Sequence, residues 1–219
     1  MDRQKIISKT EAFVKDTLKG SEAGHDWSHI ERVVRNARTL AAREKADPFI
    51  VELAALLHDI ADSKFHDGNE ELGPERSMQF LKDLGLPDDV IDHVVSIVRH
   101  VSFKNELDSS REKVFDSIEL RVLKDADRLD AIGAIGIARA FHYGGYKNRD
   151  LYDPLIKPLH KQSKEHYKKS KAPTINHFYE KLLLLKEKMN TQTGREMAEE
   201  RHALMETFLD HFYREWEGR

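Results

Sequence analysis

The chain has no cysteine among its 219 residues, and this absence excludes several kinds of functional site. Disulfide bonds, thiol nucleophiles and cysteine-based zinc sites all need a thiol. Any metal ion must therefore be held by histidine, aspartate or glutamate. The absence of disulfides also suits a reducing compartment.

The sequence also lacks a strong excess of one charge and any long apolar run. Charged residues make up 34% of the chain, yet the net charge is only −3, so the basic excess typical of nucleic-acid-binding proteins is missing. No segment approaches the roughly 20 apolar residues of a membrane span, and the N-terminus has no apolar run of signal-peptide length. We expect a cytoplasmic protein with no membrane partner and no specific nucleic-acid partner.

What the sequence does contain is helical periodicity, without a strand-rich region or an internal repeat. We therefore predict an all-α fold. Asp26 and Asp47 stand where helix N-caps are expected, and Pro48 follows Asp47 at a favoured first position. The segments predicted to form helices are residues 2–19, 26–43, 48–65, 74–84, 88–101, 118–141, 173–189 and 194–216.

The pair His58-Asp59 interrupts the most apolar stretch of the chain, residues 51–65. The same dipeptide occurs at residues 25–26 and 66–67, so by itself it is a weak signal. Helical spacing places apolar residues three and four positions before each member, so we expect both side chains to face the interior. Burying a carboxylate beside an imidazole costs free energy unless the two are paired or bound to a cation.

Two other predicted helices also carry a possible ligand on an apolar face. His29 shares a face with apolar residues four, eight and eleven positions later. Asp127 has apolar residues four and seven positions away on both sides, whereas Asp125 and Asp130 lie off that stripe. The small residues Gly133, Ala134 and Gly136 are expected to let another helix approach closely.

Two imidazoles and two carboxylates, from His29, His58, Asp59 and Asp127, form a ligand set suited to Mn, Fe, Co, Ni or Zn, and less well to Mg. On an octahedral ion, four protein ligands leave two positions for water and a phosphate oxygen. Metal-assisted hydrolysis requires such an arrangement.

The sequence around these residues resembles a known family. The order His…His-Asp…Asp and the strings H-D-W-S-H-I-E-R-V, A-L-L-H-D-I-A-D-S-K-F and K-D-A-D-R-L-D-A-I-G-A-I-G-I-A-R resemble the HD-domain superfamily of metal-dependent phosphohydrolases. They are similar in particular to the stand-alone bacterial proteins of the YedJ and YpgQ type. The resemblance implies an HD-domain helical bundle over residues 1–145, with a basic loop and C-terminal helices over residues 146–219 packed on it as one domain.

The resemblance also implies one divalent ion, manganese first, held by His29, His58, Asp59 and Asp127. Relatives that cleave nucleotides often carry an acidic residue four positions after the histidine of the pair, which here is Asp62. We therefore expect Asp62 to act on the attacking water as general base or acid. The alternative is a solvent-facing carboxylate at a helix end.

Lys64 and Arg128 are candidates for phosphate contacts, because a polyanion needs cations around the metal. Arg128 equally fits an ordinary basic helix face. His93 and His100 share a helix face and are possible further site residues, a second metal included, with a core or capping role as the alternative.

The expected activity is hydrolysis of (deoxy)nucleoside triphosphates with release of pyrophosphate, as resemblance to the YpgQ type implies. A nucleotidase that removes a single phosphate is the enzymatic alternative, and a nucleotide- or signal-binding module with a structural metal is the non-enzymatic one. The basic segment 157–171 is either a solvated loop or a lid that supplies cations to the substrate; RNA or DNA binding there rests only on six lysines and two histidines. The C-terminal helices are also long enough to support a homodimer.

Overall fold

The computed structural model describes residues 2–20, 26–61, 69, 71–101, 115–159 and 172–219. Every regular element in these ranges is helical, which confirms the predicted all-α class. The chain forms two compact units, residues 1–127 and residues 128–219. Two compact units do not show which segments fold together, so the expected division at residue 145 stays a prediction.

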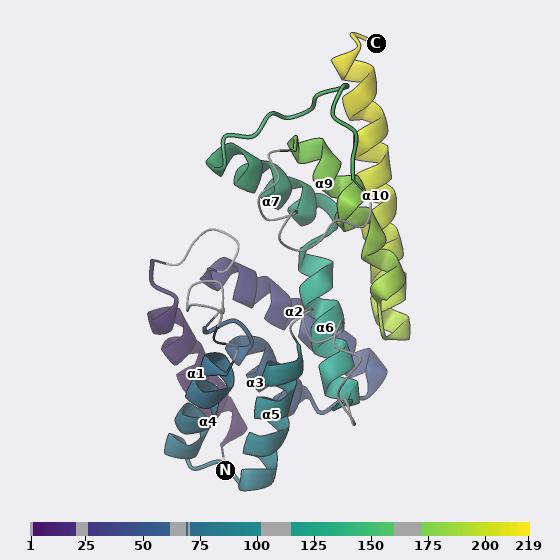
Figure 1. Ribbon diagram of the computed structural model, residues 1–219. Helices are drawn as coiled ribbons and strands as arrows, with labels where there is room; N and C mark the ends of the chain where they lie inside the picture. Colours follow the sequence, from purple (N-terminus) through teal and green to yellow (C-terminus); the bar gives the residue numbers. More distant parts are fainter. Residues whose placement is uncertain (1, 21–25, 62–68, 70, 102–114, 160–171) are drawn as a thin grey trace. The chain divides into compact units, whose positions relative to one another are not determined.

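The first unit is centred on an apolar helix, α3 (Pro48–Leu57), in which eight of ten residues are buried. Helix α3 packs against α1, α2 and α5, and α4 packs against α5 (Figure 1). These four neighbours are α1 (Arg3–Thr17), α2 (Trp27–Glu44), α4 (Leu72–Asp83) and α5 (Asp88–His100). A further helix, α6 (Ile118–Asp130), begins in this unit.

Aspartate caps begin the first three helices. The Asp2 side chain accepts a hydrogen bond from the Lys5 amide, and Asp26 accepts one from the His29 amide. Asp47 accepts from the amide of Phe49 at 2.8 Å, with Pro48 in the first turn. Each cap satisfies a helix N–H group that has no partner within its helix. The predicted caps at Asp26 and Asp47 are confirmed.

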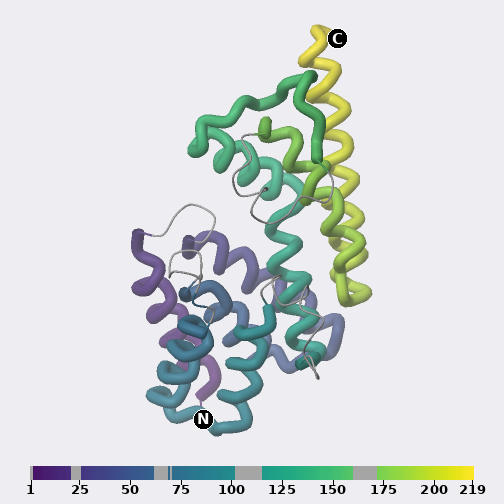
Figure 2. Tube along the Cα trace, viewed as in Figure 1, coloured from purple at the N-terminus to yellow at the C-terminus, as the bar shows by residue number. Residues whose placement is uncertain are grey.

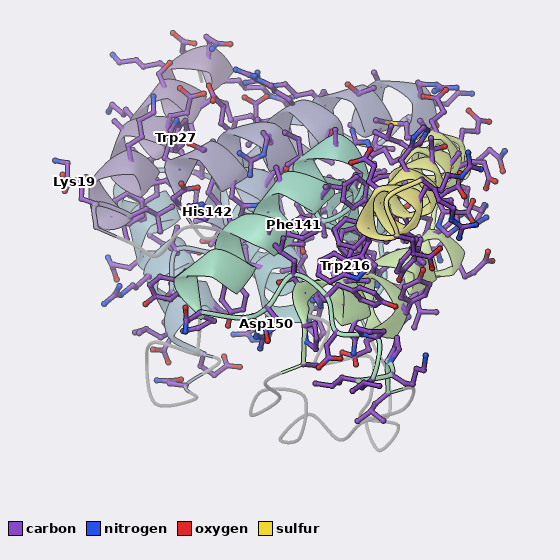
Figure 3. All side chains as sticks on the ribbon, turned by 90° about the horizontal axis from the view of Figure 1, so that it is seen from above. Lys19, Trp27, Phe141, His142, Asp150 and Trp216 are labelled. Atoms are coloured by element: carbon purple, nitrogen blue, oxygen red, sulfur yellow. The ribbon has the colours of Figure 1, made fainter. Side chains whose placement is uncertain are left out.

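The second unit is built on α10 (Gln192–Trp216), which packs against α7 (Gly133–Tyr146) (Figure 2). A shorter helix, α9 (Thr174–Glu180), packs against α7. Phe141 of α7 lies 6.0 Å, between ring centroids, from Phe178 of α9 and 5.8 Å from Phe208 of α10. Figure 3 labels Phe141, as well as Trp216 near the end of α10. Phe178 is fully buried, and contacts among these large rings stabilise the unit.

The single helix predicted over residues 118–141 is wrong, because the chain breaks between α6 and α7. Helix α6 ends at Asp130, and Gly133, where α7 begins, adopts φ +74°, a left-handed conformation that favours glycine. A Cβ on Gly136 would lie 2.3 Å from the carbonyl oxygen of Ala131, so the turn also needs glycine there. The small residues therefore serve this break, although Gly133 does also contact the Arg201 side chain of α10.

The helix predicted over residues 173–189 is also interrupted. Helix α9 ends at Glu180, and Lys181 leaves the helical region at φ −142° and ψ −57°. Two short 3-10 turns follow, Leu182–Leu184 and Lys186–Lys188. They bury Leu182 and Leu185 and leave Leu184 exposed. Because residues 182–185 are all leucine, their sequence does not reveal which of them face inward.

Most of the basic segment 157–171, from residue 160 onward, lies outside the described residues. Within the described ranges, the helices are all too short or too polar to cross a membrane.

Candidate metal centre

His29 lies in the first turn of α2, on the face that packs into the core. Its residue is only 2% exposed, and Val33, Ala37 and Leu40 on the same face are fully buried. The N-cap Asp26 binds the His29 amide at 3.0 Å, which fixes the start of the helix. The predicted inward orientation of His29 is confirmed.

Helix α3 ends at Leu57, earlier than predicted, so His58 and Asp59 lie in the turn that follows it. The His58 Nδ1 atom lies 2.8 Å from the carbonyl oxygen of Ala55, one turn back. A carbonyl oxygen can only accept, so Nδ1 is the donor in this contact, and Nε2 is the ring nitrogen left for a metal. In histidines that bind a metal, a hydrogen bond of this kind from the other ring nitrogen commonly orients the ring.

His29, His58 and Asp59 form a compact cluster of donor atoms. One ligand atom from each lies within 4.8 Å of the other two. The two imidazole rings are 5.5 Å apart and inclined by 63°. Asp59 Oδ2 lies 3.9 Å from His29 Nε2, and the Asp59 side chain is 18% exposed. The turn after α3 therefore presents its donors to the first turn of α2.

Asp127 of α6 joins this group through His29: its Oδ1 lies 3.5 Å from His29 Nε2. Its side chain is 44% exposed, whereas Asp125 is fully buried and Asp130 is 2% exposed. The inference that Asp127 occupies the core stripe and the other two lie off it was therefore wrong about burial. Because a substrate must reach the metal, an accessible carboxylate next to a buried histidine suits this site.

The distances from His29 to the two carboxylates fit a divalent ion. Two ligands each about 2.1 Å from one ion can be at most about 4.2 Å apart. The distances from His29 Nε2 to Asp59 and Asp127, 3.9 Å and 3.5 Å, lie within that limit. Imidazole and carboxylate together suit the first-row transition metals.

Arg128 follows Asp127 on α6, and neighbouring helix positions point in different directions. The Arg128 residue is 9% exposed, and its guanidinium donates to the main-chain carbonyl of Lys188 in the second unit. A phosphate contact by Arg128 stays a prediction. Asp62 and Lys64 lie outside the described residues.

His93 and His100 have local partners. His93 Nε2 lies 3.4 Å from Glu119 Oε2 and 3.3 Å from the Ser117 hydroxyl. His100 Nδ1 lies 2.8 Å from the carbonyl of Ser96. These contacts support structural roles for the contacted nitrogens. Within the described part of the chain, neither histidine belongs to a cluster of three or more possible metal ligands.

The sequence reasoning did not single out Asn36, although it lies seven residues after His29 on the same helix. Its side-chain amide donates to the carbonyl of Ala126, the residue before Asp127. The spacing of seven was a usable signal, because two helical turns return a side chain to the same face.

Comparison with known proteins identifies a family for this chain. Residues 26–132 match the HD domain family, a span that includes His29, His58, Asp59 and Asp127. The YpgQ protein of Bacillus subtilis is 38% identical over 209 residues, which are 95% of this chain and 93% of YpgQ.

Solved structures extend the similarity to nearly the whole chain. The crystal structure of an HD-superfamily hydrolase from Bacillus thuringiensis is 41% identical, with a TM-score of 0.79, and the match covers 99% of this chain and 100% of that one. The structure of B. subtilis YpgQ in complex with ADP is 36% identical, with a TM-score of 0.75, over 98% of this chain and 97% of that one. The chain therefore belongs to the HD-domain superfamily of metal-dependent phosphohydrolases, among its stand-alone bacterial proteins of the YpgQ type.

Proposed function

We propose that this protein hydrolyses nucleoside or deoxynucleoside triphosphates to a monophosphate and pyrophosphate, most effectively with Mn²⁺. The metal ligands in this proposal are His29, His58, Asp59 and Asp127. The observation that carries it is the donor cluster of His29, His58 and Asp59, which lie within 4.8 Å of one another in an HD domain.

The choice of a nucleotide substrate is supported by a relative. B. subtilis YpgQ, which is 36% identical over 98% of this chain, was solved in complex with ADP. A nucleotide polyphosphate also suits a site that combines imidazoles with carboxylates, because such sites can hold a divalent ion beside phosphate oxygens. Release of pyrophosphate follows from the resemblance to the YpgQ type.

The proposed reaction adds water to the α-phosphorus. The new bond joins the water oxygen to that phosphorus, and the bond from the α-phosphorus to the α,β-bridging oxygen breaks. The water proton passes to Asp62 as general base, and the bridging oxygen leaves with pyrophosphate. A divalent ion, when bound, polarises a phosphoryl oxygen and makes water more acidic. Lys64 and Arg128 are the proposed contacts to the phosphates.

The two histidines have different supports in this scheme. His29 is held by its burial in the first turn of α2. His58 is held by the hydrogen bond from its Nδ1 to the Ala55 carbonyl, which leaves Nε2 as the ring nitrogen available to a metal. A ligand whose second nitrogen is hydrogen-bonded binds metal in a defined orientation. Both side chains are therefore organised before substrate arrives.

The experiment incubates metal-stripped protein with a panel of nucleotides and with Mn²⁺, Mg²⁺, Co²⁺, Ni²⁺ or Zn²⁺, and resolves the products. We expect monophosphate plus pyrophosphate, with ¹⁸O from labelled water in the monophosphate. Asp59→Ala should abolish turnover. Asp83→Ala is the matched control, because Asp83 is an exposed carboxylate at the end of α4 that accepts a hydrogen bond from Gln79.

Other product patterns would contradict the proposal. Diphosphate plus phosphate, or nucleoside plus phosphate, would identify a nucleotidase instead. Binding of nucleotide without turnover under any metal would identify a binding module whose metal is structural.

A further inference from the structure

Besides His29, helix α2 carries a second polar side chain, Asn36, that contacts the helix bearing Asp127. Asn36 follows His29 by seven residues, which is about 10.5 Å along the helix axis and nearly the same face. Its side chain is half-buried. The neighbouring residues Val33, Ala37 and Leu40 are fully buried, so this part of α2 is fixed in the core.

The Asn36 side chain binds the helix that carries Asp127. Its Nδ2 donates to the carbonyl oxygen of Ala126 at 3.2 Å, a contact between residues 90 apart in the sequence. This oxygen also lies in a position to accept the helical amide four residues later, and a carbonyl has two lone pairs for the two donors. The next residue, Asp127, places Oδ1 at 3.5 Å from His29 Nε2. Helices α2 and α6 are therefore joined by two neighbouring polar contacts.

The position of the Asp127 carboxylate depends on the position of the α6 backbone. Its side chain is 44% exposed, so packing alone does not fix it. Leu123 and Ala126 of α6 are fully buried, but apolar burial has no preferred direction and tolerates small shifts along the helix axis. A hydrogen bond fixes the donor and the acceptor to within a few tenths of an ångström. Metal ligands need placement to within about 0.5 Å.

We propose that Asn36 is a positioning residue for the metal site, which fixes α6 against α2 so that Asp127 and His29 can bind one ion together. It acts through Asp127 and does not contact the ion. This inference rests on the proposed metal ligands, but it does not depend on which nucleotide is the substrate.

The experiment measures binding of Mn²⁺ to metal-stripped full-length protein by calorimetry, and the visible absorption of bound Co²⁺, which reports ligand number and geometry. The variants are Asn36→Ala, Asp127→Ala and the double variant. The matched control is Thr39→Ala, an exposed residue on α2 whose hydroxyl donates to the Arg35 carbonyl of its own helix. Asn36→Gln, which keeps the amide, tests rescue, and Asn36→Leu, which keeps the branching at Cγ without a hydrogen-bond donor, replaces Asn36→Ala if that variant does not fold.

We expect Asn36→Ala to weaken Mn²⁺ binding about 10-fold, within the range for residues that orient metal ligands. Its Co²⁺ spectrum should shift toward that of Asp127→Ala, and Asn36→Gln should recover part of the affinity. In the Asp127→Ala background, removing Asn36 should have no further effect, because the two residues act as one unit. Thr39→Ala should bind Mn²⁺ like the wild type.

Two results would overturn the inference: wild-type affinity in Asn36→Ala, or a loss of the same size in the presence and absence of Asp127. If these variants behave as expected but no nucleotide is hydrolysed, the positioning role stands and the proposed substrate fails. If wild-type protein binds neither Mn²⁺ nor Co²⁺, the metal ligands themselves are wrong, and this inference fails with them.

Discussion

Replacing Asp59 with asparagine removes one negative charge from the donor cluster and preserves the shape of the side chain. Asp59 is 18% exposed, and its Oδ2 lies 3.9 Å from His29 Nε2, so water screens this part of the site only partly. The Asp59 carboxylate and a bound ion, even when counted as two unit charges about 4 Å apart, interact by about 4 kcal/mol at an effective dielectric constant of 20. Since about 1.4 kcal/mol is a tenfold change in affinity, losing that interaction corresponds to almost three decades in Kd. The amide oxygen of asparagine remains a weak ligand, so we expect Mn²⁺ binding to weaken at least about 100-fold.

The assay titrates Mn²⁺ into metal-stripped wild type and Asp59→Asn by calorimetry at pH 7.5 and 0.15 M salt. Initial rates with a nucleoside triphosphate are then measured across Mn²⁺ concentrations. We expect the rate curve of Asp59→Asn to shift to higher Mn²⁺ by the same factor as its Kd. Asp83→Asn is the control, because it removes the same charge from an exposed position on α4.

Wild-type affinity and rate in Asp59→Asn would refute the reasoning, because the carboxylate would then play no part in binding the ion. An equal loss in Asp83→Asn would show that net charge, and not the donor cluster, sets the affinity. Normal Mn²⁺ binding with no turnover would leave the metal site intact and move the role of Asp59 to the reaction itself.

Three further predictions concern stability. In Mn²⁺ at 100 times Kd, the free energy of unfolding of the wild-type protein should rise by about 2.7 kcal/mol over that of the metal-free protein. Calorimetry should show this as a Tm increase of at least about 5 °C. At the same Mn²⁺ concentration, the free energy of unfolding of Asp59→Asn should rise by almost nothing. Gly136→Ala should destabilise the protein by at least about 1 kcal/mol in urea unfolding, because the added Cβ would lie 2.3 Å from the Ala131 carbonyl oxygen. The control is Gly145→Ala on the same helix, whose added Cβ would meet nothing within 4 Å and which should be neutral or stabilising. Burial lowers the pKa of His177 to about 3 from 6.5, so the stability that its neutral form provides is complete above pH 6.5 and is lost as the pH falls from there toward 3. His177→Gln should therefore lose about 1 kcal/mol less stability than wild type between pH 7.5 and 5.5, and an equal loss in both proteins would contradict that pKa.

The features that depend on neighbouring residues could be predicted from the sequence. The N-caps at Asp26 and Asp47 and the inward face of α2 follow from local hydrogen bonding and from the helical repeat. The inward position of His29 could be predicted for the same reason, since its face also carries Val33 and Ala37. The absence of cysteine limits the possible metal ligands to histidine and carboxylates, whatever the fold.

Periodicity failed where the conformational freedom and small size of glycine decide the backbone. A 3.6-residue repeat continues through Gly133, so the sequence pattern alone favours one helix across it. The chain turns there because Gly133 can adopt φ +74° and because Gly136 lacks the side chain that would strike the Ala131 carbonyl. The exposure of Asp127 was missed because an apolar stripe does not show which of its positions another helix covers.

The sequence by itself therefore determined the helical class, the capped starts of the helices and the chemical nature of the ligands. Only the tertiary structure decided that His58 and Asp59 lie in a turn beside His29, with Asp127 next to His29 and Asn36 bonded to Ala126. The physical reason is the range of the interactions. Caps and helical faces depend on residues within one or two turns, whereas this donor cluster brings together side chains from two helices and a turn whose separation in space the local pattern does not encode.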